Sequence, residues 1–175
     1  MWQVLLYRPS VLSMLYTPQS LRRGERGLTE ESARELMARG LYGILSLRTP
    51  DGGAYGVPLH FAWDGADKLY FHAATQGKKL DCIGQAPRVS FCIVGECSVQ
   101  ARYFSTSYRS VIIDGDASLV ETTEMKKKAL HLLLAKYTPG HMEAGLQYAE
   151  RALDKTHIIQ LHISNWCGKH GFKAP

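Results

Sequence analysis

Three short apolar stretches between residues 41 and 73 constrain the fold more than any other part of this sequence. They cover residues 41–47, 54–63 and 68–73, and turn-forming residues separate them at 49–53 (TPDGG) and 64–67 (DGAD). Apolar runs of this length, bounded by Gly, Pro and Asp, are typical of strands joined by tight turns. Because such short connections join antiparallel neighbours, we expect an antiparallel meander here.

Pro58 lies inside the second of these stretches. A proline cannot donate a backbone hydrogen bond to a neighbouring strand. It therefore indicates an edge strand, a bulge, or a place where something other than a strand approaches the backbone. The sequence leaves these three alternatives open.

The remaining segments predict further helices and strands. Thr29 is a good N-cap and Gly40 a good C-terminal residue for a helix over 28–40. Gly115 is expected to form a bulge or bend in a long strand. The other expected helices cover 78–85, 122–137 and 141–153, the other strands cover 88–94, 108–120 and 156–163, and a long connection covers 95–107.

This order of elements predicts a mainly β fold of the α+β type, with about six antiparallel strands in a barrel or sheet and flanking helices. The length of 175 residues suits one domain. We expect an N-terminal extension over 1–21 and a single domain over 22–175. The apolar runs in the extension are too short to span a bilayer and lack the features of a signal peptide.

The composition, 45% hydrophobic and 21% charged, is that of an ordinary globular protein. The net charge of +5 suits an anionic ligand but does not by itself indicate nucleic acid. The cysteines form no Cys-x-x-Cys pair and match no zinc pattern. We therefore expect free thiols, no metal site, and a cytoplasmic protein that is not bound to a membrane; these cysteines are Cys82, Cys92, Cys97 and Cys167.

Lys78 and Lys79 stand together at the expected start of the helix over 78–85, directly after Gly77. The start of a helix offers unpaired backbone N–H groups and the positive end of the helix dipole. Two ammonium groups oppose this dipole, so they are better explained by a bound anion such as phosphate. The alternative is a solvated pair of lysines in a surface loop.

Several common signatures are absent from the sequence. No Gly-x-Ser-x-Gly elbow occurs, no Gly-x-Gly-x-x-Gly follows a strand, and the Gly77 to Lys79 segment lacks the second glycine and the Ser or Thr of a P-loop. A nucleotide would therefore bind in another way.

From Arg22 to about Lys169, the chain resembles the flavin-binding split-barrel superfamily, typified by pyridoxamine 5'-phosphate oxidase, and most closely its nitroimidazole-resistance branch. The order and spacing of several segments carry the resemblance. They are Arg22-Arg23 with Leu28-Thr29, Tyr42 to Ser46, Tyr55 to Leu59, Leu69 to Ala74 with Gly77-Lys78-Lys79, Val89-Ser90-Phe91, Tyr108 to Ile112, and Gly115-Asp116-Ala117.

The resemblance implies a split-barrel homodimer with flavin mononucleotide (FMN) between the subunits. Lys78 and Lys79 would hold the flavin phosphate, and His72 would touch the cofactor or face the substrate. Ser110 would come from the partner subunit, and Trp166 with Lys169 would close the site. The strand residues implied to bind the cofactor are Leu45, Ser46, Val57, Pro58 and Leu59.

The implied activity is the FMN-dependent reduction of small nitroaromatic compounds, with His72 as the catalytic residue. His72 would donate a proton or hold the nitro oxygens; the alternative is a structural histidine at a strand end. The segment Val57-Pro58-Leu59-His60 lacks the basic residues of the oxidase, which argues against pyridoxamine phosphate as the substrate.

Two other functions stay open. One is a non-catalytic flavin-binding protein. The other is a haem-binding or haem-degrading split barrel, which needs an axial ligand. The candidate ligands are His72, His131, His157 and His162, although His157 and His162 fall on opposite faces of their strand.

Overall fold

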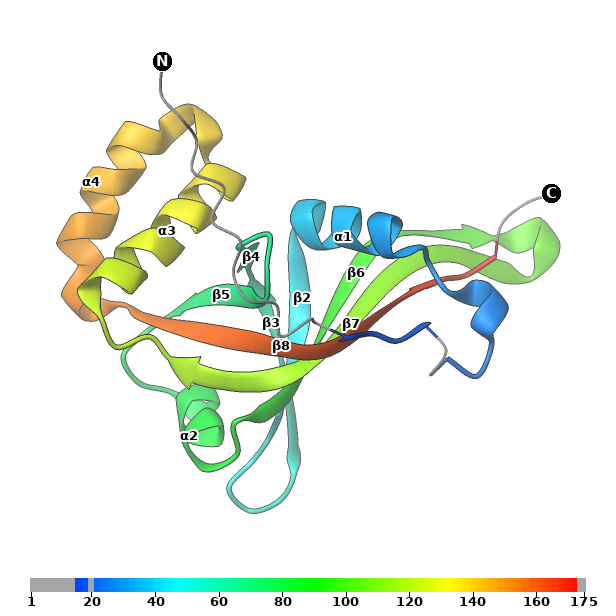
Figure 1. The fold of residues 1–175 in the computed structure, drawn as a ribbon, viewed down its shortest axis with the longest axis horizontal. Helices are drawn as coiled ribbons and strands as arrows, with labels where there is room; N and C mark the ends of the chain where they lie inside the picture. The colour runs from blue at the N-terminus through cyan, green and yellow to red at the C-terminus, as the bar shows by residue number, and fades with distance from the viewer. Residues whose placement is uncertain (1–14, 19–20, 173–175) are drawn as a thin grey trace.

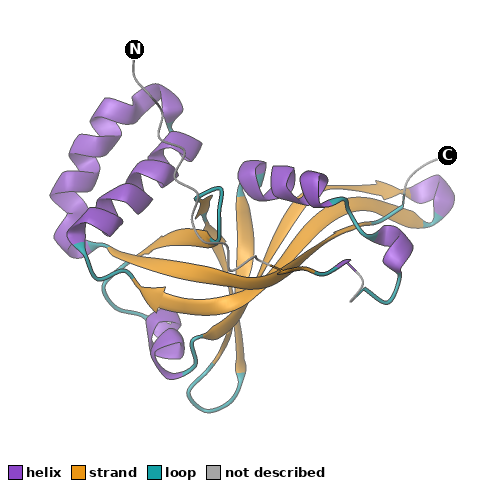
Figure 2. Cartoon of the chain, viewed as in Figure 1, coloured by secondary structure: helices purple, strands orange, loops and turns teal. Residues whose placement is uncertain are grey.

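The computed structural model describes residues 15–18 and 21–172. Within these residues, eight strands form one sheet, and four α-helices flank it (Figures 1 and 2). The strands are β1 (Leu15–Tyr16), β2 (Tyr42–Arg48), β3 (Ala54–His60), β4 (Ala62–Trp63), β5 (Lys68–Ala73), β6 (Arg88–Gln100), β7 (Ser105–Leu119) and β8 (His157–His170). The helices are α1 (Glu30–Arg39), α2 (Lys78–Gln85), α3 (Thr123–Tyr137) and α4 (Met142–Ala152).

The sheet curls into a barrel that is open along one seam. Its strand order is β3-β2-β6-β7-β8-β5-β4, and all pairs along this path are antiparallel. The strands β3 and β5 contact each other without pairing, so the seam lies between them. The short strand β1 adds to β8 as a parallel neighbour.

Alternate residues of the strands fill the inside of the barrel. Phe91 lies at the centre, with its ring 5.2 Å from that of Phe61 and 4.9 Å from that of Phe71, both edge to face. Such T-shaped pairs suit the charge distribution of aromatic rings. The helix α1 packs on this core through Ala33 and Met37, both fully buried.

The helices α3 and α4 lie side by side at one end of the molecule (Figure 1). They form a single excursion of the chain between β7 and β8. A second, smaller hydrophobic cluster joins α3 to the barrel, made of Tyr70, Val120, Ala129 and Ile158. The helix α2 follows β5 in the chain, so it begins close to one end of the seam.

The predicted fold class is confirmed: the protein is mainly an antiparallel β-sheet with flanking helices. Six long strands carry the fold, and β1 and β4 are additions of two residues each. Thr29 caps α1 by accepting the N–H of Ser32 at 3.2 Å. Pro58 lies on β3, which is an edge strand, and the pairing register shifts between Asp114 and Gly115, as a bulge requires.

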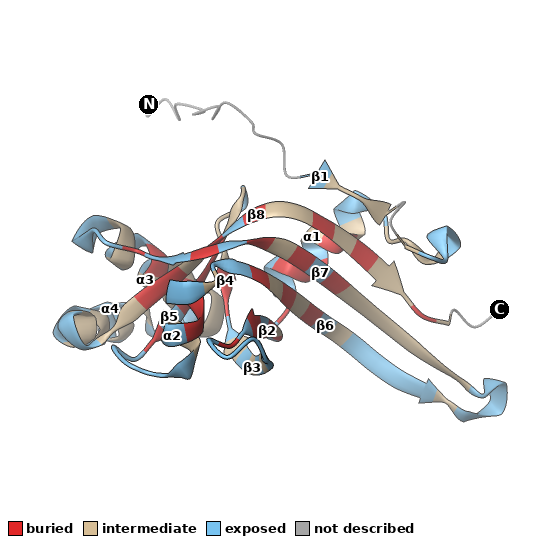
Figure 3. Ribbon diagram, turned by 90° about the horizontal axis from the view of Figure 1, so that it is seen from below, coloured by how far each residue is buried: buried red, intermediate tan, exposed pale blue. Residues whose placement is uncertain are grey.

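Two expectations were wrong. Residues 95–107 are not a long connection, because β6 and β7 keep pairing out to Gln100 and Ser105 and form a hairpin that projects from the body (Figure 3). We call this hairpin the β6–β7 arm. Its side chains cover no core, Val99 being 78% exposed, so the sequence shows no apolar alternation there. The last strand likewise continues beyond residue 163, to His170.

The second apolar stretch also divides into β3 and β4 around Phe61. The hydroxyl of Tyr137 accepts the N–H of Phe61 at 3.0 Å and lies 2.9 Å from its carbonyl oxygen. A side chain of α3 therefore takes the place of a strand partner at this break.

None of the four cysteines forms a disulfide bond. In the described ranges, no helix has both the length and the apolar composition needed to cross a membrane. No cluster of three or more potential metal ligands occurs in the same part of the chain. The N-terminal extension is described only for residues 15–18 and 21, so its boundary with the domain at residue 22 stays a prediction.

Candidate functional site

The start of α2 is an uncapped helix terminus. Gly77 precedes the helix with φ 137°, a backbone conformation that strongly favours glycine, and no side chain caps the first amides. Leu80 donates its N–H to the carbonyl of Gly77 at 2.8 Å, which closes the first turn. The amides of Lys78 and Lys79 stand ahead of this turn, where a helix has no acceptor of its own.

Lys78 and Lys79 bring two ammonium groups to this terminus. The Nζ atom of Lys78 lies 4.7 Å from the centre of the Tyr55 ring on β3, in a cation–π contact. Among the described residues, neither lysine has a carboxylate within 4.0 Å. Lys78 is a minor cause of the lowered pKa of the exposed Asp51, whose main cause is the Thr49 hydroxyl. An anion would therefore neutralise two charges that the protein leaves unpaired.

The seam between β3 and β5 leads from this helix start along the barrel. The side chains of Val57 and Leu59 point inward and pack on the core, whereas Pro58 and His60 are exposed on the outer side. His72 is also exposed, near the end of β5. A flat ligand along the seam would thus meet the free backbone edge of β3, with His60 and His72 beside it.

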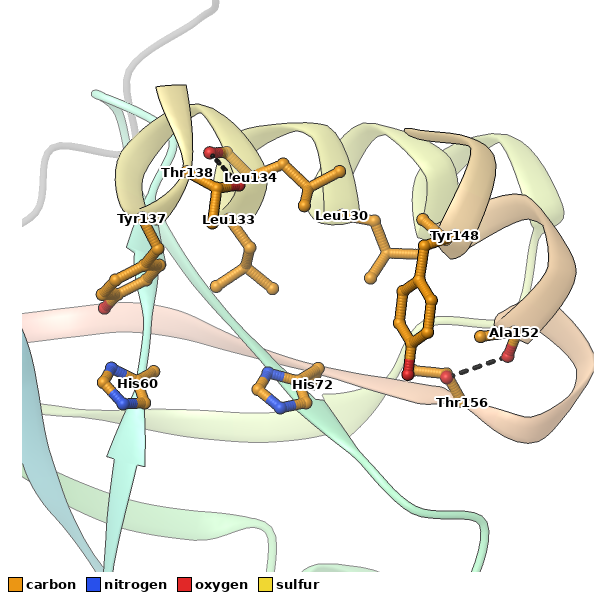
Figure 4. A pocket seen from close by; sticks show the side chains of 11 residues that line it. His60, His72, Leu130, Leu133, Leu134, Tyr137, Thr138, Tyr148, Ala152 and Thr156 are labelled. Atoms are coloured by element: carbon orange, nitrogen blue, oxygen red, sulfur yellow. Dashed lines mark hydrogen bonds between the residues drawn. The ribbon is translucent and has the colours of Figure 1, made fainter. Parts of the chain in front are cut away.

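A cavity of about 410 Å³ lies between these two histidines and the helices α3 and α4 (Figure 4). We call it the α3–α4 cavity. The strands contribute only the two histidines. The helices α3 and α4 contribute the rest, except for Thr138, directly after α3, and Thr156, four residues after α4. Its lining residues are His60, His72, Leu130, Leu133, Leu134, Tyr137, Thr138, Tyr148, Ala149, Ala152 and Thr156.

The ring of His60 is held in one orientation. Its Nδ1 atom lies 3.1 Å from the carbonyl oxygen of Leu41, and because a carbonyl only accepts, Nδ1 is the donor. The ring also packs edge to face on Tyr137, with 4.8 Å between centroids. In the neutral form of His60, the Nε2 atom therefore carries the lone pair.

Tyr137 is fixed just as firmly. Its hydroxyl lies 2.6 Å from the carbonyl oxygen of Leu41 and 2.9 Å from that of Phe61. Burial raises the pKa of the Tyr137 hydroxyl, so the group stays protonated and acts as the donor. The same carbonyl of Leu41 thus positions both His60 and Tyr137.

The pKa of His72 is lowered, first by burial and then by the nearby His60 and Lys79. A lowered pKa makes the imidazole neutral at neutral pH. A neutral His72 can hold a polar group through one ring nitrogen as donor and the other as acceptor. Because its pKa is lowered, His72 is in the protonated, proton-donating form less often than an ordinary histidine.

The structure brings some predicted site residues together and separates others. Pro58, His72, Lys78 and Lys79 gather along the seam and the helix start that follows it. Leu45 is fully buried in the core, Ser46 is exposed on the outer face of β2, and Ser110 is half-buried on β7. The cofactor roles of these residues stay predictions.

Trp166 is 1% exposed and packs on Tyr16 and Arg34, at 4.6 Å and 5.2 Å from the ring centre, on the α1 side of the sheet. It does not line the α3–α4 cavity. Of the other histidines proposed as haem ligands, His131 is exposed on α3 and His162 pairs with Asp67 at 3.0 Å. His72 alone among these candidates lines the cavity.

His60 is the site residue that the sequence analysis missed. On its own, a histidine at the end of an exposed edge strand has no distinguishing pattern. Its position depends on Leu41 and Tyr137, which lie 19 and 77 residues away along the chain. Only the Tyr137 position in α3, together with the break at Phe61, could have directed attention to it.

A second cavity, of about 490 Å³, lies between α1 and the base of the β6–β7 arm. Three of its four charged groups are already paired, since Glu35 lies 3.4 Å from Arg39 and 3.6 Å from Arg109; the fourth is Glu96. Because these charges neutralise each other, this cavity offers less for a ligand than the seam and the α3–α4 cavity do.

The pyridoxamine 5'-phosphate oxidase family model matches residues 29–170. This range includes the seam, the start of α2 and both helices over the cavity. A comparison with curated protein sequences finds no significant match.

Solved structures share the fold at low sequence identity. A candidate 5-nitroimidazole antibiotic resistance protein from Bacteroides thetaiotaomicron is 19% identical, with a TM-score of 0.70 over 82% of this chain and 84% of that chain. The flavocytochrome Anf3 from Azotobacter vinelandii is 18% identical, with a TM-score of 0.74 over 89% and 73%. An FAD and haem binding protein from Mycobacterium smegmatis is 21% identical, with a TM-score of 0.69 over 84% and 73%. At these identities, the likeness concerns the fold.

Proposed function

Because the chain belongs to the pyridoxamine 5'-phosphate oxidase family, we propose that it binds FMN along the β3–β5 seam and reduces small nitroaromatic compounds. The observation that carries this proposal is the pair of unpaired lysines at the uncapped start of α2, directly beside the seam. Together, the lysine pair and the seam suit a ligand that has an anionic end and a flat body.

Lys78, Lys79 and the first amides of α2 hold the phosphate in this proposal. Ammonium groups and helix N-terminal amides are a recurrent combination for binding phosphate. Lys79 is half-buried, so its charge is less screened by water than that of an ordinary surface lysine. The cation–π contact with Tyr55 keeps the Lys78 side chain near β3.

The flavin ring lies along the exposed backbone edge of β3 in this proposal. Pro58 has no N–H to offer a strand there, which suits a neighbour that is a ligand. Bound flavin, once reduced by an external electron donor, would pass those electrons to the substrate. The protein supplies position: His60 and His72 lie on the outer side of the seam, where the polar groups of a substrate would reach them.

A homodimer is part of the proposal. The outer face of the sheet carries a row of apolar side chains in register across four strands: Ile44, Cys92, Ile112 and Cys167. Ile112 is 39% exposed and Val94 is 41% exposed in the single chain. A second copy on this face would cover the row and bring the partner's surface towards the seam. Ser110 lies on the same strand as Ile112, which suits its predicted contact with the partner's flavin.

The choice of substrate rests on the fold's relatives and on charge. One similar structure is described as a candidate 5-nitroimidazole antibiotic resistance protein. The segment from Val57 to His60 contains no lysine or arginine that would grip the phosphate of a phosphorylated substrate. A cytoplasmic location also belongs to the proposal, supported by four cysteines that form no disulfide.

The phosphate site is tested by replacing Lys78 and Lys79 with alanine, singly and together. Each lost charged contact should weaken FMN binding by about 1.5–3 kcal/mol, which is roughly a ten- to hundredfold rise in Kd. Quenching of flavin fluorescence measures the affinity. The matched control is Lys128→Ala, an exposed lysine on α3, which should leave the affinity unchanged.

Unchanged FMN affinity in the Lys78→Ala/Lys79→Ala double variant would place the phosphate elsewhere. Parallel titrations with FAD and FMN show which flavin the protein prefers. Anaerobic reduction of a 5-nitroimidazole by the flavin-loaded protein tests turnover. Flavin binding without turnover would favour a non-catalytic flavin-binding protein.

A haem-binding function is the second candidate, because His72 borders an apolar cavity and two similar structures are described as a flavocytochrome and as an FAD and haem binding protein. In that case, haem titration should give a Soret band that His72→Ala abolishes. An absorption spectrum of the purified protein separates flavin from haem in one measurement.

A further inference from the structure

We propose that the α3–α4 cavity is a substrate pocket for uncharged one- or two-ring aromatic compounds, and that His60 selects those with an N–H or O–H donor on the ring. The role of the ligand as the substrate rests on the proposed function; the binding itself does not need flavin.

The lining of the cavity defines the charge of its ligand. It contains no Asp, Glu, Lys or Arg. A charged ligand would leave water without meeting an opposite charge, which is costly. The pocket therefore favours neutral compounds, in contrast to the cationic start of α2.

The shape of the cavity defines the body of the ligand. Leucine and alanine side chains of α3 and α4 form one side, namely Leu130, Leu133, Leu134, Ala149 and Ala152. Tyr137 and Tyr148 stand at opposite ends of this apolar side, and His60 and His72 lie across from it (Figure 4). A volume of about 410 Å³ lies in the lower part of the range for small-molecule pockets, which suits a compact planar molecule.

The hydrogen bonding of His60 defines the polar edge of the ligand. The bond from Nδ1 to Leu41 leaves Nε2 as an acceptor in the neutral ring. Packing on Tyr137 holds this acceptor in place before the ligand arrives. A ligand N–H or O–H would satisfy it, whereas an alkylated analogue would bury it unsatisfied. Buried polar groups that lose their partner are the strongest source of discrimination between similar ligands.

His72 completes the polar side. Its neutral imidazole, beside His60, can both donate and accept, so it can hold a second polar group such as a nitro oxygen. It lines the cavity and is also close enough to Lys79 for that charge to lower its pKa. The pocket and the proposed phosphate site are thus adjacent parts of one surface, with His72 close to both.

Two probes that differ only at the donor test this inference: 4-nitroaniline, which has an N–H donor, and N,N-dimethyl-4-nitroaniline, which has none. Calorimetric titration of the flavin-free protein should show that 4-nitroaniline binds at least about tenfold more tightly. His60→Phe keeps an aromatic ring on Tyr137 and removes the acceptor. In this variant, the preference for 4-nitroaniline should disappear.

A matched pair of substitutions on α4 tests the location. Ala149→Trp fills the cavity and should weaken both probes at least about tenfold. Ala144→Trp makes the same change at an exposed position of the same helix and should leave both affinities unchanged. Circular dichroism and thermal unfolding confirm that each variant is folded.

Equal affinity of the wild-type protein for the two probes would overturn the role of His60. Unchanged binding in folded Ala149→Trp protein would overturn the location. Displacement of 4-nitroaniline by FMN would assign the cavity to the flavin ring and would also overturn the proposal. If the probes behave as expected but FMN does not bind, the proposed pocket stands and the proposed flavin function fails. If FMN binds but the protein does not discriminate between the probes, the flavin function stands and the proposed role of His60 fails.

Discussion

The ammonium group of Lys136 is buried without a hydrogen-bond partner in the described structure. Its Nζ atom lies 3.7 Å from the centre of the Phe61 ring, so a cation–π contact compensates part of the lost hydration. Burial lowers the pKa of Lys136 from 10.5 to about 8. The residue therefore carries its charge at neutral pH at a cost to stability.

Replacing Lys136 with methionine should raise the free energy of unfolding at pH 7 by about 1–3 kcal/mol, because the charge is removed and the packing is retained. Denaturant unfolding measures the change. Lys128→Met, at an exposed position of the same helix, should stay within about 0.5 kcal/mol of wild type. Loss of stability in Lys136→Met would show that the ammonium group has an unrecognised partner.

The same residue predicts a pH dependence. Between pH 8 and 10.5, the unfolded chain keeps the Lys136 proton while the folded protein releases it, so stability rises with pH across this window. The Lys136→Met variant should lack this part of the rise. If the pKa of Lys136 in the folded protein were near 10.5, the wild-type protein and Lys136→Met would show the same pH dependence of stability, which would contradict the prediction.

The structural role of a single residue was predictable where its backbone conformation, its hydrogen-bonding capacity or its local charge sets it apart. Pro58 indicated the edge strand, and the Lys78 to Lys79 pair stood out because it opposes the dipole of α2. His60 and Lys136 were not predictable in this way. Their surroundings come from Leu41, Phe61 and Tyr137, and only the folded chain brings these residues together.

At the scale of elements, the bulge on β8 opposite Gly115, where Ser164 is the extra residue, shows how strictly the barrel fixes one position. A Cβ atom on Gly115 would overlap the carbonyl oxygen of His162 on the paired strand β8. The backbone cannot yield there without breaking the pairing on both sides of the register shift. Gly84, within α2, has no atom within 4 Å of the place where its Cβ would lie.

Gly115→Ala should therefore destabilise the protein by more than about 2 kcal/mol. Gly84→Ala, the same change in an open helical position, should stabilise it by about 0.5–1 kcal/mol. The midpoints of thermal or denaturant unfolding give both values. A mild effect of Gly115→Ala would mean that β8 can shift away from Gly115.

Elements with local signals were found at close to their observed bounds. Thr29 marks the start of α1, Gly77 the start of α2, and Pro139 the end of α3. The β6–β7 arm was missed because residues near Gly95 and beyond are polar and exposed. Their strand conformation comes from pairing with the other half of the hairpin, and a polar, exposed pair of strands leaves no alternation in the sequence.

At the scale of the whole molecule, the uncovered apolar row on the outer sheet face predicts self-association. Light scattering should give the mass of a dimer for the wild-type protein. Ile112→Glu places a charge in the middle of the row and should give a monomer with greatly weakened FMN affinity. Leu146→Glu, at a residue 42% exposed on α4, is the control and should remain dimeric.

A monomeric wild-type protein, or a dimer that tolerates Ile112→Glu, would contradict this arrangement. The sequence resemblance predicted the dimer, but neither composition nor spacing could locate its face. The row exists only after four strands from residues 42 to 170 have paired in register.

The helices α3 and α4 leave the barrel and return to it at neighbouring points. Leu119 pairs with Ile159, and the N–H of Val120 donates to the carbonyl of Ile158 at 2.8 Å, so β7 and β8 are already joined where the helices begin and end. The strand order would be complete without residues 121–156. In descent from a common ancestor, this one continuous segment can be exchanged or redesigned while the barrel persists. In the proposed function, this segment supplies the apolar side of the α3–α4 cavity, whereas His60, His72, the seam and the start of α2 belong to the barrel and its connections.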